Sequence, residues 1–217
     1  MNAKLTTISF LMGLFLLTAP VVTQAQESSP QKSPPLIAKK LVVLGDSLTE
    51  GYGVARESAF PALLERKIKA SGRSWQVINA GVSGSTTASG IGRMKWIFRN
   101  KPDLVILCLG ANDGLRGLKV SESKKNLDES LRFAKEQNVQ VILGGLYMPP
   151  NYGKEYTSDF QKMYSDLAKT HKVSFIPFLL EGVGGKAQYN LADGIHPNEK
   201  GHEIIAETVY QAIKGLL

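Results

Sequence analysis

The chain has 217 residues, 43% of them hydrophobic and 21% charged, with a formal charge of +7. This composition is ordinary for a soluble protein, and the length is sufficient for one domain with a full core. The basic residues are scattered and form no stripe interleaved with aromatic residues, which argues against nucleic-acid binding. Scatter of this kind is typical of a solvated surface, although it also suits anionic membranes or substrates.

The N-terminus has the layout of a secretory signal peptide over residues 1–25. A short basic start, MNAK, precedes the apolar stretch ISFLMGLFLLTAPVV, and Ala25 stands at a cleavage point. The alternative is an uncleaved anchor, but the stretch is shorter than the roughly 20 residues of a spanning helix. We therefore expect a periplasmic or secreted protein. Residues 26–39 are polar and proline-rich, as in a flexible tether, and the folded domain is predicted over residues 40–217.

Five apolar runs are predicted to be strands: 40–45, 75–80, 103–110, 139–146 and 173–178. Most are continuous rather than alternating, as expected of parallel strands that are buried on both faces. Helical patterns lie between them at 60–71, 126–138 and 158–171, and a last helix begins near Glu199. Alternation of strand and helix predicts an α/β fold, a three-layer α/β/α sandwich with a five-stranded parallel sheet.

Several side chains are assigned to the core by pattern. The apolar stripe of the last helix is Ile205, Val209, Ala212, Ile213 and Leu216. Both tryptophans, Trp75 and Trp96, are expected in the core. Cys108 is the only cysteine, so the chain forms no internal disulfide, and it reads as a small buried residue. His202 is predicted near the surface and His171 as a cation at a helix C-terminus.

Ligands of parallel sheets bind beyond the carboxyl ends of the strands, and polar motifs follow each predicted strand. They are GDS, AGVSGST, GAND, YMPPNYG and, in the last long loop, DGIHPN. A phosphate loop is excluded because five residues separate Gly45 from Gly51 and Tyr52 replaces the lysine. The dinucleotide fingerprint and the G-x-S-x-G elbow are also absent.

Ser47 ends the first strand segment, and His196 is the histidine best placed to serve it as a base. Asp193 lies three residues before His196 in a glycine-containing turn, where its carboxylate can reach Nδ1 and leave Nε2 free for a proton. A plain Pro-Asn turn with an incidental histidine accounts for this stretch equally well.

Three groups are placed to bind an oxyanion. Asn112 directly follows the third strand, Gly84 lies in the segment after the second, and Ser47 has a backbone N–H at the start of a turn. The alternative for Asn112 is a common Asn-Asp-Gly turn.

Together these blocks resemble the SGNH (GDSL) hydrolases over residues 40–217, in the family's order. Within that family, FPALL, GANDGLRG, PPNYG and DGIHPN are similar to the bacterial periplasmic thioesterase I/protease I/lysophospholipase enzymes and arylesterases. The resemblance implies Ser47 as nucleophile, His196 as base and Asp193 as its partner, with Ser47, Gly84 and Asn112 as oxyanion hole. Relatives often have GGND where this chain has Ala111, which leaves the acyl-chain preference open.

The implied function is a serine esterase that hydrolyses acyl esters or thioesters through an acyl-enzyme. No metal and no cofactor are expected. The apolar segment 146–156 predicts substrate contacts from Tyr147, Met148 and Pro149, with an ordinary surface loop as its alternative. We expect a monomer whose partner is a small acyl ester, in transient contact with membrane lipid. The alternatives are a carbohydrate acetylesterase of the same fold and a non-catalytic lipid carrier.

Overall fold

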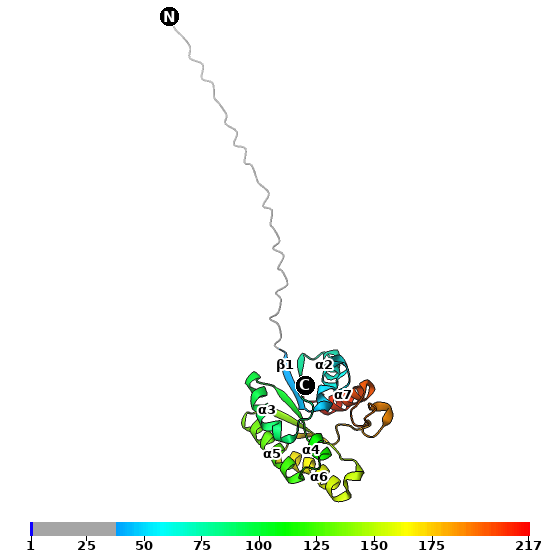
Figure 1. Cartoon of the computed structure of the whole chain (residues 1–217). Coiled ribbons are helices and arrows are strands. Elements are labelled where there is room, and N and C mark those ends of the chain that lie inside the picture. Colours follow the sequence, from blue (N-terminus) through cyan, green and yellow to red (C-terminus); the bar gives the residue numbers. More distant parts are fainter. Residues whose placement is uncertain (2–37) are drawn as a thin grey trace. The chain divides into compact units, whose positions relative to one another are not determined.

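All five apolar segments form strands of one sheet, and every neighbouring pair is parallel (Figure 1). In the computed structural model, which describes Met1 and residues 38–217, the order across the sheet is β2-β1-β3-β4-β5. The strands are β1 (Lys39–Gly45), β2 (Trp75–Gly81), β3 (Leu104–Cys108), β4 (Gln140–Gly144) and β5 (Ser174–Ile176). The predicted five-stranded parallel sheet is confirmed.

Helices cover both faces of this sheet, which confirms the three-layer sandwich. On one face α2 (Phe60–Ala70) packs against α7 (Glu199–Ile213). On the other face, α5 (Val120–Glu136) packs between α3 (Gly90–Ile97) and α6 (Lys154–His171). Two short helices, α1 (Ser47–Glu50) and α4 (Ala111–Leu115), directly follow β1 and β3. The short 3₁₀ turns are η1 (Arg56–Ser58), η2 (Thr87–Ser89), η3 (Phe98–Asn100), η4 (Pro150–Tyr152) and η5 (Ala187–Tyr189).

Burial along the strands follows their place in the sheet. Every residue of β3 is buried, as expected for a central parallel strand with helices on both faces. In β2 only Trp75 is fully buried, because this strand lies at the edge of the sheet beside β1 alone. A continuous apolar run therefore indicates full burial for the central strands but not for β2.

The buried face of α7 differs from the predicted stripe in two places. Ile205, Val209 and Ile213 are buried as expected, but Ala212 is exposed, and Leu216 lies beyond the end of the helix and is half-buried. His202 was predicted near the surface, and this is wrong, because its side chain is fully buried against α2. Its Nδ1 accepts a hydrogen bond from the Phe60 N–H at 3.3 Å. That bond satisfies Nδ1 of the imidazole, whereas the buried Nε2 has no hydrogen-bond partner among the described residues.

The two tryptophans differ in burial. Trp75 is buried as predicted, whereas Trp96 is 63% exposed and its assignment to the core is wrong. α3 turns Met94 and Ile97 inward, so Trp96, which lies between them in sequence, faces outward. Cys108 is buried as predicted. Within residues 38–217 no helix is both long and apolar enough to cross a membrane.

The N-terminal assignments fall largely outside the described residues. The signal peptide at 1–25 and the tether at 26–39 are described only at Met1, Ala38 and Lys39. β1 begins at Lys39, one residue before the predicted start of the folded domain.

Because all strands are parallel, their carboxyl ends meet at one edge of the sheet, and the polar motifs gather there.

Candidate active site

Ser47 begins α1 directly beyond β1, in a turn that the Gly-Asp-Ser sequence makes compact. Asp46 caps the helix, its Oδ1 accepting the Leu48 N–H at 3.0 Å. A Cβ on Gly45 would lie 1.9 Å from Thr49 Oγ1, so the turn accepts no larger residue there. The N–H of a first helical residue has no partner inside the helix, which leaves that of Ser47 available to a ligand.

Ser47, His196 and Asp193 form a continuous chain of hydrogen bonds, although 149 residues separate the serine from the histidine. The serine Oγ lies 3.0 Å from His196 Nε2, and His196 Nδ1 lies 2.8 Å from Asp193 Oδ2. The second oxygen of Asp193 accepts the backbone N–H groups of Ile195 and His196 at 2.9 and 3.0 Å. Nε2 is thereby directed at a hydroxyl that can give it a proton.

The carboxylate is held ionised by its surroundings. Hydrogen bonds from the backbone N–H of His196, then from that of Ile195, and from the imidazole lower the pKa of Asp193 to about 2. Tyr52 lies against the other side of the imidazole, with ring centroids 4.5 Å apart. These contacts fix the orientation of His196 before any substrate binds.

Beneath the serine lies a second carboxylate, Asp46, which is fully buried. Burial raises its pKa to about 6, against the hydrogen bond from Leu48. Arg93 of α3 donates from Nη1 to the Gly45 carbonyl at 2.8 Å and from Nη2 to the Ala80 carbonyl. One side chain therefore ties the end of β1 to the end of β2. Sequence reasoning missed Arg93, because no local motif marks it.

Asn112 lies against the loop that carries Gly84. Gly84 has a φ of +76° in a turn closed by the Ser85 N–H to the Val82 carbonyl at 3.2 Å. A positive φ at this place in a β-turn favours glycine, and an added Cβ would meet only Arg116 Nη2, at 3.7 Å. The Asn112 amide donates to the Ser85 carbonyl at 3.0 Å, which leaves its second N–H for a ligand.

Two exposed side chains hold the loop that carries Gly84. The Glu50 carboxylate accepts the Ser83 N–H at 2.7 Å and also the Ser83 hydroxyl. Arg116 donates to the Gly84 carbonyl at 3.1 Å. Glu50 belongs to α1 and Arg116 follows α4, so this loop is tied both to the nucleophile helix and to the helix that carries Asn112.

A buried carboxylate anchors the far end of the same loop. Asp113 accepts the Thr87 N–H at 2.8 Å, the Thr87 hydroxyl at 2.5 Å and the Ser123 hydroxyl at 3.0 Å. Its side chain is almost fully buried, and these bonds satisfy it. Sequence reasoning chose Asn112 from the GAND motif and passed over the neighbouring aspartate.

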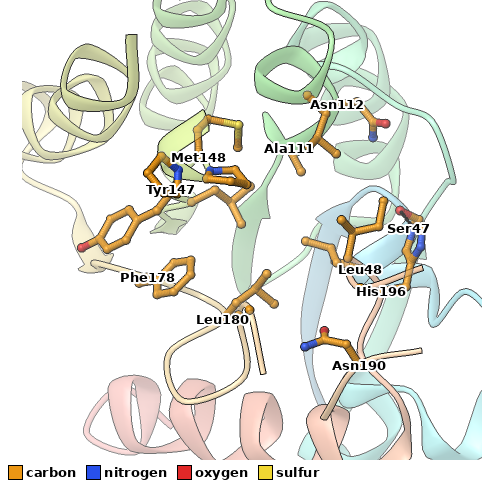
Figure 2. A pocket seen from close by; sticks show the side chains of 18 residues that line it. Ser47, Leu48, Ala111, Asn112, Tyr147, Met148, Phe178, Leu180, Asn190 and His196 are labelled. Carbon is orange, nitrogen blue, oxygen red and sulfur yellow. Dashed lines mark hydrogen bonds between the residues drawn. The ribbon is translucent and has the colours of Figure 1, made fainter. Parts of the chain in front are cut away.

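An apolar pocket of about 370 Å³ opens from Ser47 (Figure 2). Tyr147, Met148 and Pro149 all line it, as do Ala111 and Asn112, whereas Gly84 does not. Figure 2 shows Ser47 and His196 on one side of the pocket and Tyr147 and Phe178 on the other, their two rings stacked with centroids 4.3 Å apart. Sequence reasoning missed part of the lining: Leu48, Leu115, Phe178, Leu180 and Ile195.

No three His, Cys, Asp or Glu side chains within residues 38–217 are grouped in a way that could hold a metal ion. The buried thiol of Cys108 is unsuited to nucleophilic chemistry, since burial raises its pKa. His171 ends α6, and its Nε2 lies 2.7 Å from Asp128 on α5, away from the pocket lining. Ser47 lines the pocket and has an imidazole partner, His196, at 3.0 Å.

Residues 43–204 match the GDSL-like Lipase/Acylhydrolase family. The chain is 38% identical to the arylesterase of Vibrio mimicus over 177 residues, which are 81% of this chain and 88% of the relative. It is 36% identical to the thioesterase 1/protease 1/lysophospholipase L1 of Escherichia coli K12 over 185 residues, 83% of this chain and 86% of the relative. The crystal structure of TesA aligns with a TM-score of 0.80 at 36% identity, covering 82% of this chain and all of that one.

Proposed function

This chain belongs to the GDSL-like lipase/acylhydrolase family and is a carboxylic ester hydrolase, and on that premise we propose that it cleaves acyl esters and thioesters through a covalent intermediate on Ser47. The observation that carries the proposal is the hydrogen-bonded chain from Ser47 through His196 to Asp193, at 3.0 and 2.8 Å. Two of these three residues, Ser47 and His196, line the apolar pocket.

In the first half of the reaction, Ser47 Oγ attacks the acyl carbonyl carbon and His196 Nε2 takes the serine proton. Negative charge develops on the carbonyl oxygen, where the Ser47 N–H, the Gly84 N–H and the Asn112 amide stabilise it. Each such donor contributes roughly 3 kcal/mol to the transition state. The bond to the leaving alcohol or thiol then breaks as His196 returns the proton to it.

In the second half, water attacks the acyl-enzyme by the same route. His196 takes a proton from the water, the same donors hold the oxyanion, and Ser47 leaves as the hydroxyl while the carboxylic acid is released. Asp193 stays ionised throughout, because its pKa of about 2 lies far below neutral pH. It stabilises the imidazolium that forms twice in each cycle.

The pocket favours an acyl group with an apolar chain. Its walls are Leu115, Leu146, Phe178 and Leu180 together with the Tyr147–Pro149 segment, which offer hydrophobic contact to a fatty or aromatic acyl chain. A carbohydrate acetylesterase would place its sugar in an open groove and would leave this pocket unused. A lipid carrier has no need of the Ser47, His196 and Asp193 arrangement. We therefore propose fatty acyl esters, thioesters and aryl esters as the substrate class.

The leader and the tether belong to the same proposal. Residues 1–25 direct the chain across the inner membrane and are removed near Ala25, which gives a periplasmic or secreted enzyme. Residues 26–37 then form a polar link ahead of β1. The enzyme acts as a monomer on a small-molecule substrate.

The experiment is hydrolysis of p-nitrophenyl esters from acetate to palmitate by the full chain. We expect kcat/KM to peak at a medium or long chain and to fall by about 10⁴-fold or more in Ser47→Ala. Ser165→Ala, on α6, is the matched control and keeps full activity. A steep preference for acetate would favour the acetylesterase. Ligand binding with no turnover in either form would favour the carrier.

A further inference from the structure

The amino ends of the strands form the edge of the sheet opposite Ser47, and this edge carries a band of exposed positive charge. Each connection that leads into a strand contributes to it. We call six of these residues the basic edge: Lys39, Arg73, Arg99, Lys101, Lys135 and Lys172. All are exposed except Arg73, which is half-buried. Because the strand order is β2-β1-β3-β4-β5, the connections lie side by side, and at a strand spacing of roughly 4.8 Å the charges spread over about 20 Å.

These charges are not neutralised within the protein. Among residues 38–217, none of the six takes part in an ion pair. Of the nearby acidic groups, Glu65 is 2.6 Å from Lys69, and Asp103 accepts the Lys40 N–H at 2.7 Å. Helix dipoles account for part of the pattern, since Lys135 lies in the last turn of α5. Lys172 is likewise the C-cap of α6, and Arg99 and Lys101 lie at the end of η3, whereas Lys39 lies in β1 and Arg73 in the connection to β2.

Two members of the basic edge occupy strained backbone. Lys101 and Lys172 have φ values of +46° and +54°, a conformation in which glycine or asparagine costs less than lysine. The equivalent place after α5 is occupied by Asn138, at +56°. Among the described residues these are the three non-glycine positions with positive φ, and all three lie on this edge. The chain therefore places positive charge here at a backbone cost, which points to a use for that charge.

Next to these cations stands an exposed aromatic side chain. Trp96, in the last turn of α3, is 63% exposed, and Arg99 follows three residues later. Tryptophan beside lysine and arginine is the combination that lies at a membrane interface, where the ring reaches the acyl boundary and the cations meet the headgroups. Two hollows lie on the same edge. One is lined by Arg73 and by the Lys69–Glu65 ion pair, and the other by Lys135 with Lys172, which suits phosphate groups.

We propose that the basic edge, with Trp96, docks the enzyme on an anionic phospholipid surface. Charge complementarity favours that partner. Docked in this way, the protein turns the carboxyl ends of its strands, and with them Ser47, toward the water. The enzyme is thus held at a membrane while it takes its substrate from the aqueous side.

The test is co-sedimentation of the mature enzyme proposed above, residues 26–217, with large vesicles of phosphatidylcholine alone or with 30% phosphatidylglycerol, at low and high salt. We expect binding to require the anionic lipid and to be lost at high salt. Each lysine near such a surface contributes roughly fivefold, so Lys101→Asn/Lys172→Asn is expected to bind about 30-fold more weakly. Asparagine tolerates the positive φ, so this variant stays folded and its melting temperature is unchanged or higher.

The matched control is Lys119→Asn/Lys200→Asn, which removes the same charge near the other edge of the sheet, at the starts of α5 and α7. It keeps the binding of the wild type. Equal losses in both double variants would overturn the proposal, because net charge alone would then be responsible. Equal binding to both kinds of vesicle would overturn it as well. Tighter binding to a short DNA duplex than to vesicles, lost in Lys101→Asn/Lys172→Asn, would assign the edge to nucleic acid instead.

Discussion

Asp193 shows how a single residue sets the state of the site. Two backbone N–H groups and an imidazole converge on its carboxylate and lower its pKa to about 2. Asp193 is therefore expected to stay ionised over the working pH range and to contribute no step to the pH–rate profile above about pH 3. A step between pH 3 and pH 5 that disappears in Asp193→Asn would contradict this assignment.

Replacing that carboxylate by an amide separates its charge from its shape. Asp193→Asn keeps the size of the side chain but removes the negative charge that stabilises the imidazolium. The new amide N–H also favours the wrong tautomer of His196. We expect kcat to fall by about 10⁴-fold with a melting temperature within a few degrees of the wild type. Steady-state kinetics and thermal unfolding of the same preparation measure both. A kcat within tenfold of the wild type would remove Asp193 from the mechanism.

Glu50 is a positioning residue that acts through its two hydrogen bonds to Ser83 and not on the reacting atoms themselves. Without them the loop that carries Gly84 is less firmly placed, so we expect Glu50→Ala to lower kcat about tenfold with little change in KM, a positioning effect. Glu50→Gln, which still accepts a hydrogen bond, is expected to recover most of the loss. Glu57→Ala, a neighbouring exposed glutamate in η1, is the control. Equal effects at both positions would indicate general damage.

At the scale of elements, the α2–α7 contact contains a buried titratable group. Burial lowers the pKa of His202 from 6.5 to about 4. The unfolded chain therefore binds the proton first, and the contribution of His202 to stability is lost as the pH falls from 6.5 through 4. The loss amounts to at most about 3 kcal/mol at 1.36 kcal/mol per pKa unit.

The variant His202→Asn isolates that effect. Asp46, whose pKa is raised to about 6, acts in the opposite sense, because its share of the stability is lost as the pH rises from 3.8 through 6. The quantity to measure is thus the difference in unfolding free energy between wild type and variant at several pH values. Below pH 6 we expect the unfolding free energy of the variant to rise relative to that of the wild type. A constant difference from pH 7 to pH 4 would show that His202 is not buried in neutral form.

Local pattern predicted the elements well where one principle dominated. Continuous apolar runs gave the central strands, and Gly-Asp-Ser gave the turn at Ser47, because a buried strand and a tight turn each have a local signature. Pattern was wrong for Trp96 and His202, since which face of a helix is covered depends on neighbours distant in sequence. It also missed Arg93 and Phe178, which reach the site from separate parts of the chain through tertiary packing.

At the scale of the whole molecule, the parallel sheet separates two surfaces. The polar motifs and the pocket lie at the carboxyl ends of the strands, and the residues of the basic edge lie at the amino ends. Substitutions in the pocket should therefore alter acyl preference without affecting vesicle binding. We expect Leu180→Trp, which fills part of the pocket, to shift the best p-nitrophenyl ester to a shorter chain and to leave lipid binding unchanged. An unchanged acyl-length profile would show that the acyl chain lies elsewhere.

The central claim is that Ser47 carries the acyl group between the two halves of the reaction. Rapid quenching of the enzyme with p-nitrophenyl butyrate, followed by intact-mass and peptide analysis, tests it directly. We predict one butyryl group per chain, located on the peptide that contains Ser47 and absent from Ser47→Ala, which should also be inactive. Turnover that persists in Ser47→Ala, or a butyryl group found on another residue, would contradict the account.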